Sequence, residues 1–226
     1  MRIKVFYNYI LKRLGIRELL PGDILRSKEI RECNEEMVAL NSGNGIFMKE
    51  ETLYCRKSVA DKLLKVAKRL NDNNLGLFIY EIYRSPEQQR ARYEITYNNL
   101  KATTTDEKEL EMLVRRSTAG VGGGHQTGGA VDLTLCDNAG VPLDMGSKYP
   151  EKCKEMVTSY HISDVVDKNR KLLCKLMREE GFANYPNEWW HFAYGDQLWA
   201  AYKNKRYAIY GVDRLPGCTF TSFLRQ

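Results

Sequence analysis

The feature that most constrains this chain is a pair of short segments that lie far apart in the sequence and carry complementary side chains. Residues 124–132 read GHQTGGAVD, and residues 187–192 read NEWWHF. Together they hold two of the chain's three histidines, an aspartate and a glutamate. Such a set offers three metal ligands and a spare carboxylate, which is typical of a zinc centre that keeps an open position for water. The fold is therefore expected to bring the two segments together.

Individual roles follow from the preferences of zinc for imidazole and carboxylate ligands. The first segment is too rich in glycine for a helix, so we expect a loop that folds His125 back over a strand carrying Asp132. His191, on a neighbouring strand, is the third predicted ligand of one zinc ion per chain. Glu188 follows a turn and is predicted to act as general base and acid on the metal-bound water. Arg84, at a strand end, is predicted to stabilise an oxyanion.

Composition narrows the class of protein. With 226 residues, of which 43% are hydrophobic, the chain can bury a substantial core as one domain. No apolar stretch approaches the length of a membrane-spanning helix, and no standard signal peptide precedes the domain, so a cytoplasmic location is expected, with export as an alternative. The net charge of +6 is modest and no basic tract is interleaved with aromatic residues, which argues against a nucleic-acid partner.

The six cysteines are expected to be reduced and mostly buried.

Hydrophobic periodicity predicts an α+β fold, with helices and strands mixed in a single domain. Ser58 is placed to cap the first long helix, and Gly181 to end the last one. A loop is expected over residues 120–129, and Trp189 and Trp190 are expected on opposite faces of a strand. The predicted helices are residues 58–71, 86–97, 107–115 and 167–180, and the predicted strands are residues 75–83, 130–135, 189–194 and 207–212.

Three stretches together resemble the zinc D-alanyl-D-alanine dipeptidases of glycopeptide resistance and their D,D-carboxypeptidase relatives. They are YRSPEQQ at residues 83–89, HQTGGAVDLTL at residues 125–135 and NYPNEWWHF at residues 184–192. The similarity is continuous from about Leu53 to Asp196. It divides the chain into an N-terminal extension, residues 1–52, packed on a catalytic domain, residues 53–226.

The resemblance implies a central, mostly antiparallel sheet flanked by helices, as in hedgehog-type zinc domains. It implies zinc on His125, Asp132 and His191, with Glu188 as base and Arg84 as oxyanion stabiliser. The implied substrate is D-alanyl-D-alanine or a related short peptide from peptidoglycan. Oligomeric state is not readable from the sequence.

Two alternatives stay open. The family usually has Ser two residues before the first ligand, where this chain has Gly123, and residues 38–41 lack a tyrosine that the dipeptidases carry. Both departures fit a D,D-carboxypeptidase that trims longer stem peptides. A non-catalytic, zinc-stabilised binding module is the other alternative, although a closed structural site has no use for Glu188 and Arg84. His161 has no such neighbours and is interpreted as structural.

Overall fold

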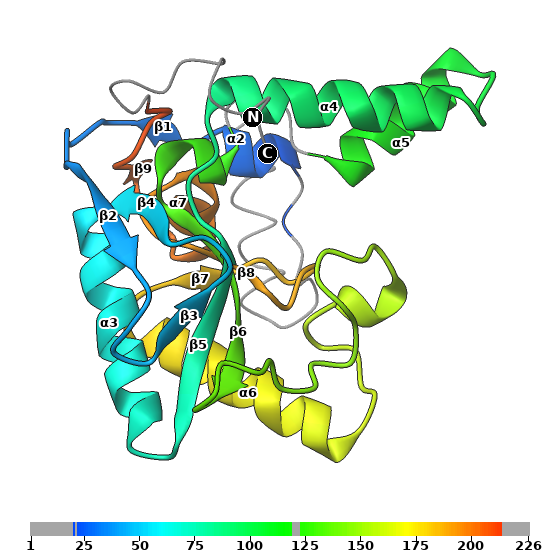
Figure 1. Ribbon diagram of the computed structural model, residues 1–226. Coiled ribbons are helices and arrows are strands. Elements are labelled where there is room, and N and C mark those ends of the chain that lie inside the picture. The colour runs from blue at the N-terminus through cyan, green and yellow to red at the C-terminus, as the bar shows by residue number, and fades with distance from the viewer. Residues whose placement is uncertain (1–19, 21, 119–122, 214–226) are drawn as a thin grey trace.

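The computed structural model describes residues 20, 22–118 and 123–213. In this part of the chain the main sheet has five strands in the order β3-β5-β6-β8-β7. Strand β3 is parallel to β5, and every other neighbouring pair is antiparallel. The predicted α+β fold with a mostly antiparallel sheet is thus confirmed (Figure 1). The strands are β3 (Ile46–Met48), β5 (Leu75–Glu81), β6 (Ala130–Asp137), β7 (Ala183–Asn184) and β8 (His191–Ala193).

Two amphipathic helices, α3 (Lys57–Asn71) and α6 (Asp164–Glu179), pack against the sheet (Figure 1). Their apolar side chains form one core cluster with alternate residues of β5 and β6. Because strand side chains alternate between faces, the residues between these point to the other face of the sheet. That second face carries the polar residues of the predicted metal site. The cluster includes Leu63, Val66, Leu173 and Met177 from the helices and Leu77, Ile79, Leu133 and Leu135 from the strands.

The remaining elements surround this core. Helices α4 and α5 form a hairpin that projects from the body of the molecule (Figure 1). Among the described residues, no helix combines the length and the apolar character that crossing a bilayer requires. These elements are α2 (Gly22–Arg26), β1 (Glu29–Ile30), β2 (Met37–Asn41), β4 (Thr52–Arg56), α4 (Pro86–Lys101), α5 (Glu107–Ser117), η1 (Gly124–Thr127), η2 (Lys154–Met156), α7 (Gln197–Tyr202) and β9 (Tyr207–Ala208).

Strand β3 falls within the stretch predicted as an N-terminal extension, yet it is an edge strand of the main sheet. Strand β2 also falls within it and pairs with β4. The division of the chain at residue 52 stays a prediction. Residues 1–19 and 21 of that extension, and Cys218, lie outside the described residues.

Several local predictions were wrong. Residues 124–127 form the 3₁₀ helix η1 rather than loop, while residues 119–122 lie outside the described part. Trp189 and Trp190 precede β8, because the backbone turns from Tyr185 to Glu188 and from Glu188 to His191 delay the strand. The predicted strand at residues 207–212 keeps only two residues, since the next two N–H groups donate to the Gly195 carbonyl.

Two side-chain predictions also fail. The Ser58 side chain does not cap α3. Instead the backbone N–H of Ser58, in the first turn of the helix, donates to Glu35 Oε1 at 2.6 Å. A residue distant in sequence thus accepts a hydrogen bond that the helix itself cannot provide. Of the described cysteines, all free, only Cys55 and Cys136 are buried. The mostly buried set expected from the sequence is therefore not found among them.

Candidate metal centre

His125 is placed by the short helix η1 at the entrance to β6. Gly128 ends this helix in the left-handed region with φ of +69°, a conformation that favours glycine. Arg56, almost fully buried, donates from Nε to the Thr127 carbonyl at 2.8 Å and so ties η1 to β4. His125 Nδ1 lies 2.7 Å from the Ile82 carbonyl oxygen, which leaves Nε2 to face Asp132. Such a backbone contact fixes the orientation and tautomer of a metal-binding imidazole.

Asp132 and His191 are placed by strand register. They lie directly opposite each other on β6 and β8, and Glu81 of β5 is opposite Asp132 on its other side. These three residues therefore form one row across three strands. A register shift between Ile79 and Glu81 precedes the row on β5, and such bulges re-aim side chains.

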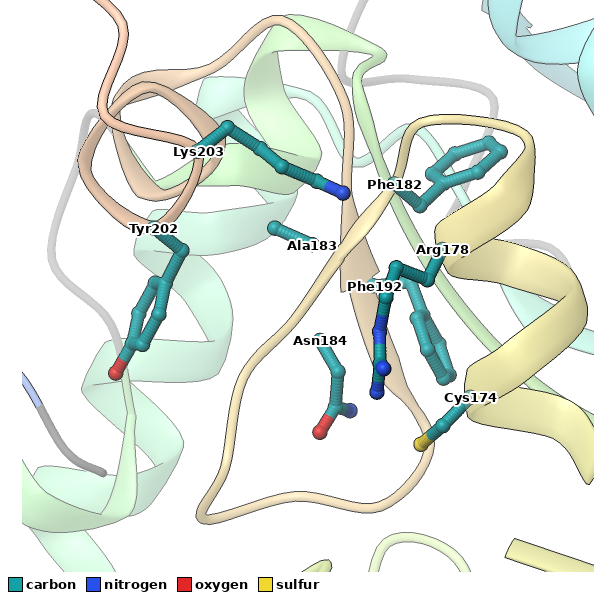
Figure 2. A pocket seen from close by; sticks show the side chains of 8 residues that line it. All are labelled: Cys174, Arg178, Phe182, Ala183, Asn184, Phe192, Tyr202 and Lys203. Atoms are coloured by element: carbon teal, nitrogen blue, oxygen red, sulfur yellow. The ribbon is translucent and has the colours of Figure 1, made fainter. Parts of the chain in front are cut away.

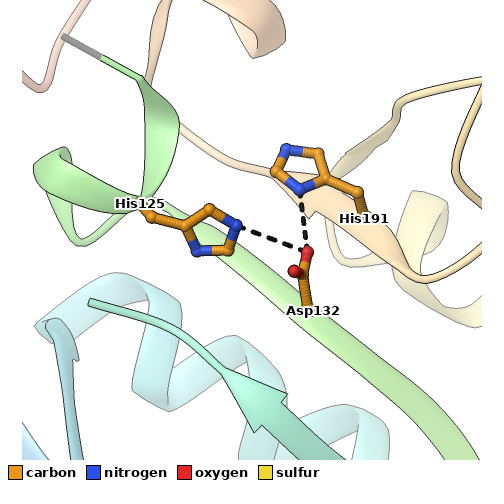
Figure 3. A group of neighbouring side chains, drawn as sticks. All are labelled: His125, Asp132 and His191. Atoms are coloured by element: carbon orange, nitrogen blue, oxygen red, sulfur yellow. Dashed lines mark hydrogen bonds and ion pairs between the residues drawn. The ribbon is translucent and has the colours of Figure 1, made fainter. Parts of the chain in front are cut away.

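The three predicted ligands meet on the second face of the sheet (Figure 3). Asp132 Oδ1 lies 2.8 Å from His191 Nδ1 and 3.4 Å from His125 Nε2. One ligand atom from each residue lies within 4.8 Å of the other two. Tetrahedral zinc with bonds of about 2.0 to 2.1 Å separates its ligand atoms by about 3.3 Å. Two nitrogens and one oxygen at these separations would fit three ligands of one zinc ion.

The electrostatics of the cluster suit a cation. Burial raises the pKa of Asp132, but the neighbouring imidazoles of His125 and His191 outweigh burial and hold that pKa below its usual range. Burial lowers the pKa of His191, and the hydrogen bond and charge of Asp132 overcome this and raise it. The buried carboxylate thus attracts positive charge, which protons or a divalent ion can supply in competition.

One aromatic residue that the sequence analysis did not single out, Tyr149, contacts Asp132. The Tyr149 hydroxyl lies 3.2 Å from Asp132 Oδ2 and 3.3 Å from Glu81 Oε2. Its ring stacks on Tyr80 with centroids 4.2 Å apart and meets Trp190 edge to face. Tyr149 comes from the irregular excursion between β6 and α6, so only the folded chain reveals this contact. It gives the aspartate oxygen that faces away from the two imidazoles a partner of its own.

Arg84 lies close to the cluster and is 9% exposed, so it is not a surface residue. Its guanidinium contacts both carboxylate oxygens of Glu81, with Nε to Oε1 at 2.7 Å, and Nη1 donates to Gln89 Oε1 at 2.5 Å. Burial lowers the pKa of Arg84, but the hydrogen bond and charge of Glu81 outweigh burial, so the net effect is a raised pKa. The side chain therefore stays charged. The backbone N–H of Arg84 donates to the His125 carbonyl, so the arginine and the histidine are linked directly.

Glu188 does not belong to the three-residue cluster, and its role as a base stays a prediction. It is joined to His191 by a backbone hydrogen bond of 3.1 Å from the His191 N–H to the Glu188 carbonyl. Asn184 braces this turn, because its Nδ2 donates to the carbonyls of both Glu188 and His191. The Glu188 carboxylate contacts Lys152 Nζ. His161, by contrast, pairs with Asp167 and is exposed, which fits its structural interpretation.

A cavity of about 190 Å³ lies behind β8 (Figure 2). Phe192 lines it, and strand alternation places Phe192 on the face opposite His191. None of the three clustered residues lines this cavity, so it is separate from the candidate metal centre. It is lined by Cys174, Arg178, Phe182, Ala183, Asn184, Phe192, Tyr202 and Lys203.

The fold places a cluster of three side chains that could hold a metal ion on one face of a mixed sheet. The sequence model of the D-ala-D-ala dipeptidase family matches residues 43–212, and the chain belongs to this family. A D-alanyl-D-alanine dipeptidase from Synechocystis sp. is 37% identical over 95 residues, which cover 37% of this chain and 38% of that protein. Another, from Escherichia coli, is 29% identical over 153 residues, which cover 67% and 71%.

Solved structures give a weaker likeness. VanYB in complex with D-alanine-D-alanine is 16% identical, with a TM-score of 0.47, and the match covers 76% of this chain and 84% of that one. The LdcB LD-carboxypeptidase is 19% identical with a TM-score of 0.45, covering 77% of this chain and 74% of that one.

Proposed function

We propose that this chain is a zinc-dependent peptidase that hydrolyses D-alanyl-D-alanine or a related short peptide derived from peptidoglycan. The observation that carries the proposal is the convergence of His125, Asp132 and His191, with Glu188 beside the last of them. Family membership supports the same activity. One zinc ion, when bound by these three residues, would supply a water of lowered pKa and polarise the scissile carbonyl.

The protein's own groups have distinct tasks in this proposal. Glu188 takes the proton of the attacking water and delivers it to the leaving amine, because its carboxylate stands outside the ligand set. Arg84 faces the oxyanion, with Glu81 and Gln89 holding its guanidinium in place before substrate arrives. Ile82 and Tyr149 orient His125 and Asp132 through the hydrogen bonds described above.

A D,D-carboxypeptidase acting on longer stem peptides is the second candidate. Gly123 favours it, because this position carries a glycine where the dipeptidases have a serine that helps to hold the substrate amine. A longer substrate does not present a free amine there. A cytoplasmic location and the lack of nucleic-acid partners stay predictions.

The test is release of D-alanine from D-alanyl-D-alanine and from a stem pentapeptide, with zinc-loaded and with chelator-treated protein. We expect turnover that chelator removes and zinc restores. The ratio of the two rates assigns the dipeptidase or the carboxypeptidase. Absence of release from both substrates by zinc-loaded protein contradicts the proposed function.

A further inference from the structure

Lys152 lies beside the proposed catalytic glutamate. It belongs to the excursion between β6 and α6, and its Nζ contacts Glu188 Oε1. The Nζ also lies 5.7 Å from the centroid of the Trp190 ring. The lysine side chain is 42% exposed, whereas the Glu188 side chain is 18% exposed. A cation open to solvent thus stands at the edge of the site, over a more buried carboxylate.

The other two cations near the cluster, Arg84 and Arg92, both contact Glu81. The proposed function assigns the remaining N–H hydrogens of Arg84 to the oxyanion. Arg84 directs Nε and Nη2 to Glu81 and Nη1 to Gln89. Arg92 places Nη1 3.3 Å from Glu81 Oε2. Lys152 has three donor hydrogens on one rotatable ammonium, and its contact with Glu188 occupies one direction only. Among these three it is the cation best able to add a second anionic partner.

The chemistry of the proposed reaction locates such an anion. A general acid that protonates the leaving amine must come within about 2.6 to 3.2 Å of its nitrogen. When the leaving group is a C-terminal amino acid, a single carbon atom separates that nitrogen from the free carboxylate. The carboxylate therefore lies within a few bond lengths of Glu188, in the region that the Lys152 ammonium occupies.

We propose that Lys152 binds the C-terminal carboxylate of the substrate and so restricts cleavage to the last peptide bond of a free chain end. This inference rests on the proposed function. The lysine neutralises Glu188 before substrate binds and gains the carboxylate as a second partner afterwards. A peptide that continues beyond the scissile bond, or ends in an amide, offers no charge to this ammonium.

The experiment compares D-alanyl-D-alanine with its C-terminal amide, both cleaved at the same bond, for zinc-loaded wild-type protein and for Lys152→Met, Lys152→Gln and Lys152→Arg. Wild-type protein is expected to favour the free acid. Loss of one hydrogen-bonded charge pair in Lys152→Met should lower the acid-to-amide ratio of kcat/KM by roughly 10- to 100-fold, and this ratio cancels any change in Glu188 that affects both substrates equally. Lys152→Gln should behave like Lys152→Met, and Lys152→Arg should keep most of the preference.

Lys154→Met is the matched control, because this lysine is 70% exposed in its side chain and contacts Glu155 instead. Its acid-to-amide preference should equal that of wild type. Circular dichroism and zinc content establish that each variant is folded and loaded. An unchanged preference in both Lys152→Met and Lys152→Gln overturns the inference alone, as does an equal fall in kcat for both substrates. Wild-type protein that releases D-alanine from neither D-alanyl-D-alanine nor the stem pentapeptide overturns the proposed function and this inference with it.

Discussion

Asp132 and His191 face each other directly across the β6–β8 ladder, with Asp132 Oδ1 2.8 Å from His191 Nδ1. Two ladder positions therefore place two of the three predicted zinc ligands, and a slip of either strand by one residue would send its ligand to the opposite face. The hydrophobic alternation of β6, with Val131 and Leu133 in the core, fixes this register. Burial of the core thus positions the metal centre.

Replacing Asp132 with alanine should abolish stable zinc binding. The variant keeps two imidazoles but loses the carboxylate whose charge favours a cation. We expect less than stoichiometric zinc after dialysis, measured by elemental analysis, together with loss of activity. Asp61→Ala, on the exposed surface of α3, should retain the metal. Full zinc content in Asp132→Ala would remove Asp132 from the ligand set.

Glu188→Ala should separate metal binding from catalysis. Because Glu188 lies outside the ligand cluster, the variant should bind zinc as wild type does. Loss of the general base should lower kcat by about 10²- to 10⁴-fold. Zinc content and D-alanine release, measured on the same preparation, check both halves of this expectation. Near-native turnover would show that another group activates the water.

Tyr149→Phe should weaken zinc binding without disturbing the fold. The change removes the hydroxyl that contacts Asp132 and Glu81 but keeps the ring stacked on Tyr80. Loss of such a contact behind a metal ligand typically costs about 10- to 100-fold in metal affinity or activity. Competition with a chromophoric chelator measures this affinity. The control is Tyr80→Phe, which preserves the stacked pair and should bind zinc normally; equal affinities for the two variants would argue against the role of Tyr149.

The sequence predicts the parts of the site that depend on short-range pattern. His125 precedes a glycine pair and a strand, and Asp132 lies at an alternate position of that strand, so their proximity follows from local geometry. Strands β5 and β6 and helices α3 and α6 were likewise predicted, because each has a clear apolar period. Roles in catalysis remain predictions for all of the site residues.

Contacts made by irregular chain were beyond sequence reasoning. Tyr149 and Lys152 reach the site from the irregular segment between β6 and α6, which has no periodic pattern. Their positions depend on the tertiary packing of that segment. Trp189 and Trp190 have strand-forming side chains, but hydrogen-bonded turns take precedence over that propensity. The N-terminal end of α3 is capped by the carboxylate of Glu35, a tertiary contact, and not by the Ser58 side chain.

Glu35 should make the stability of the protein depend on pH. Partial burial raises the pKa of Glu35, but hydrogen bonds from Ser58 and Tyr210 and the charge of Arg56 outweigh burial and lower it. As pH falls, the unfolded chain therefore takes up this proton first. The stabilising contribution is complete above the unfolded pKa of about 4.3 and is lost as pH falls through the folded pKa.

Glu35→Ala tests this dependence, because it removes the acceptor at the start of α3. Near neutral pH we expect the free energy of unfolding to fall by about 0.5 to 2 kcal/mol, as for loss of a helix cap. The difference from wild type should shrink as pH falls through the lowered folded pKa, because wild-type Glu35 then also becomes protonated. Urea unfolding at a series of pH values measures it. Glu36→Ala, at an exposed neighbour, should show little change at any pH; a Glu35→Ala effect that stays constant into acid would mean that packing, not charge, supplies the stabilisation.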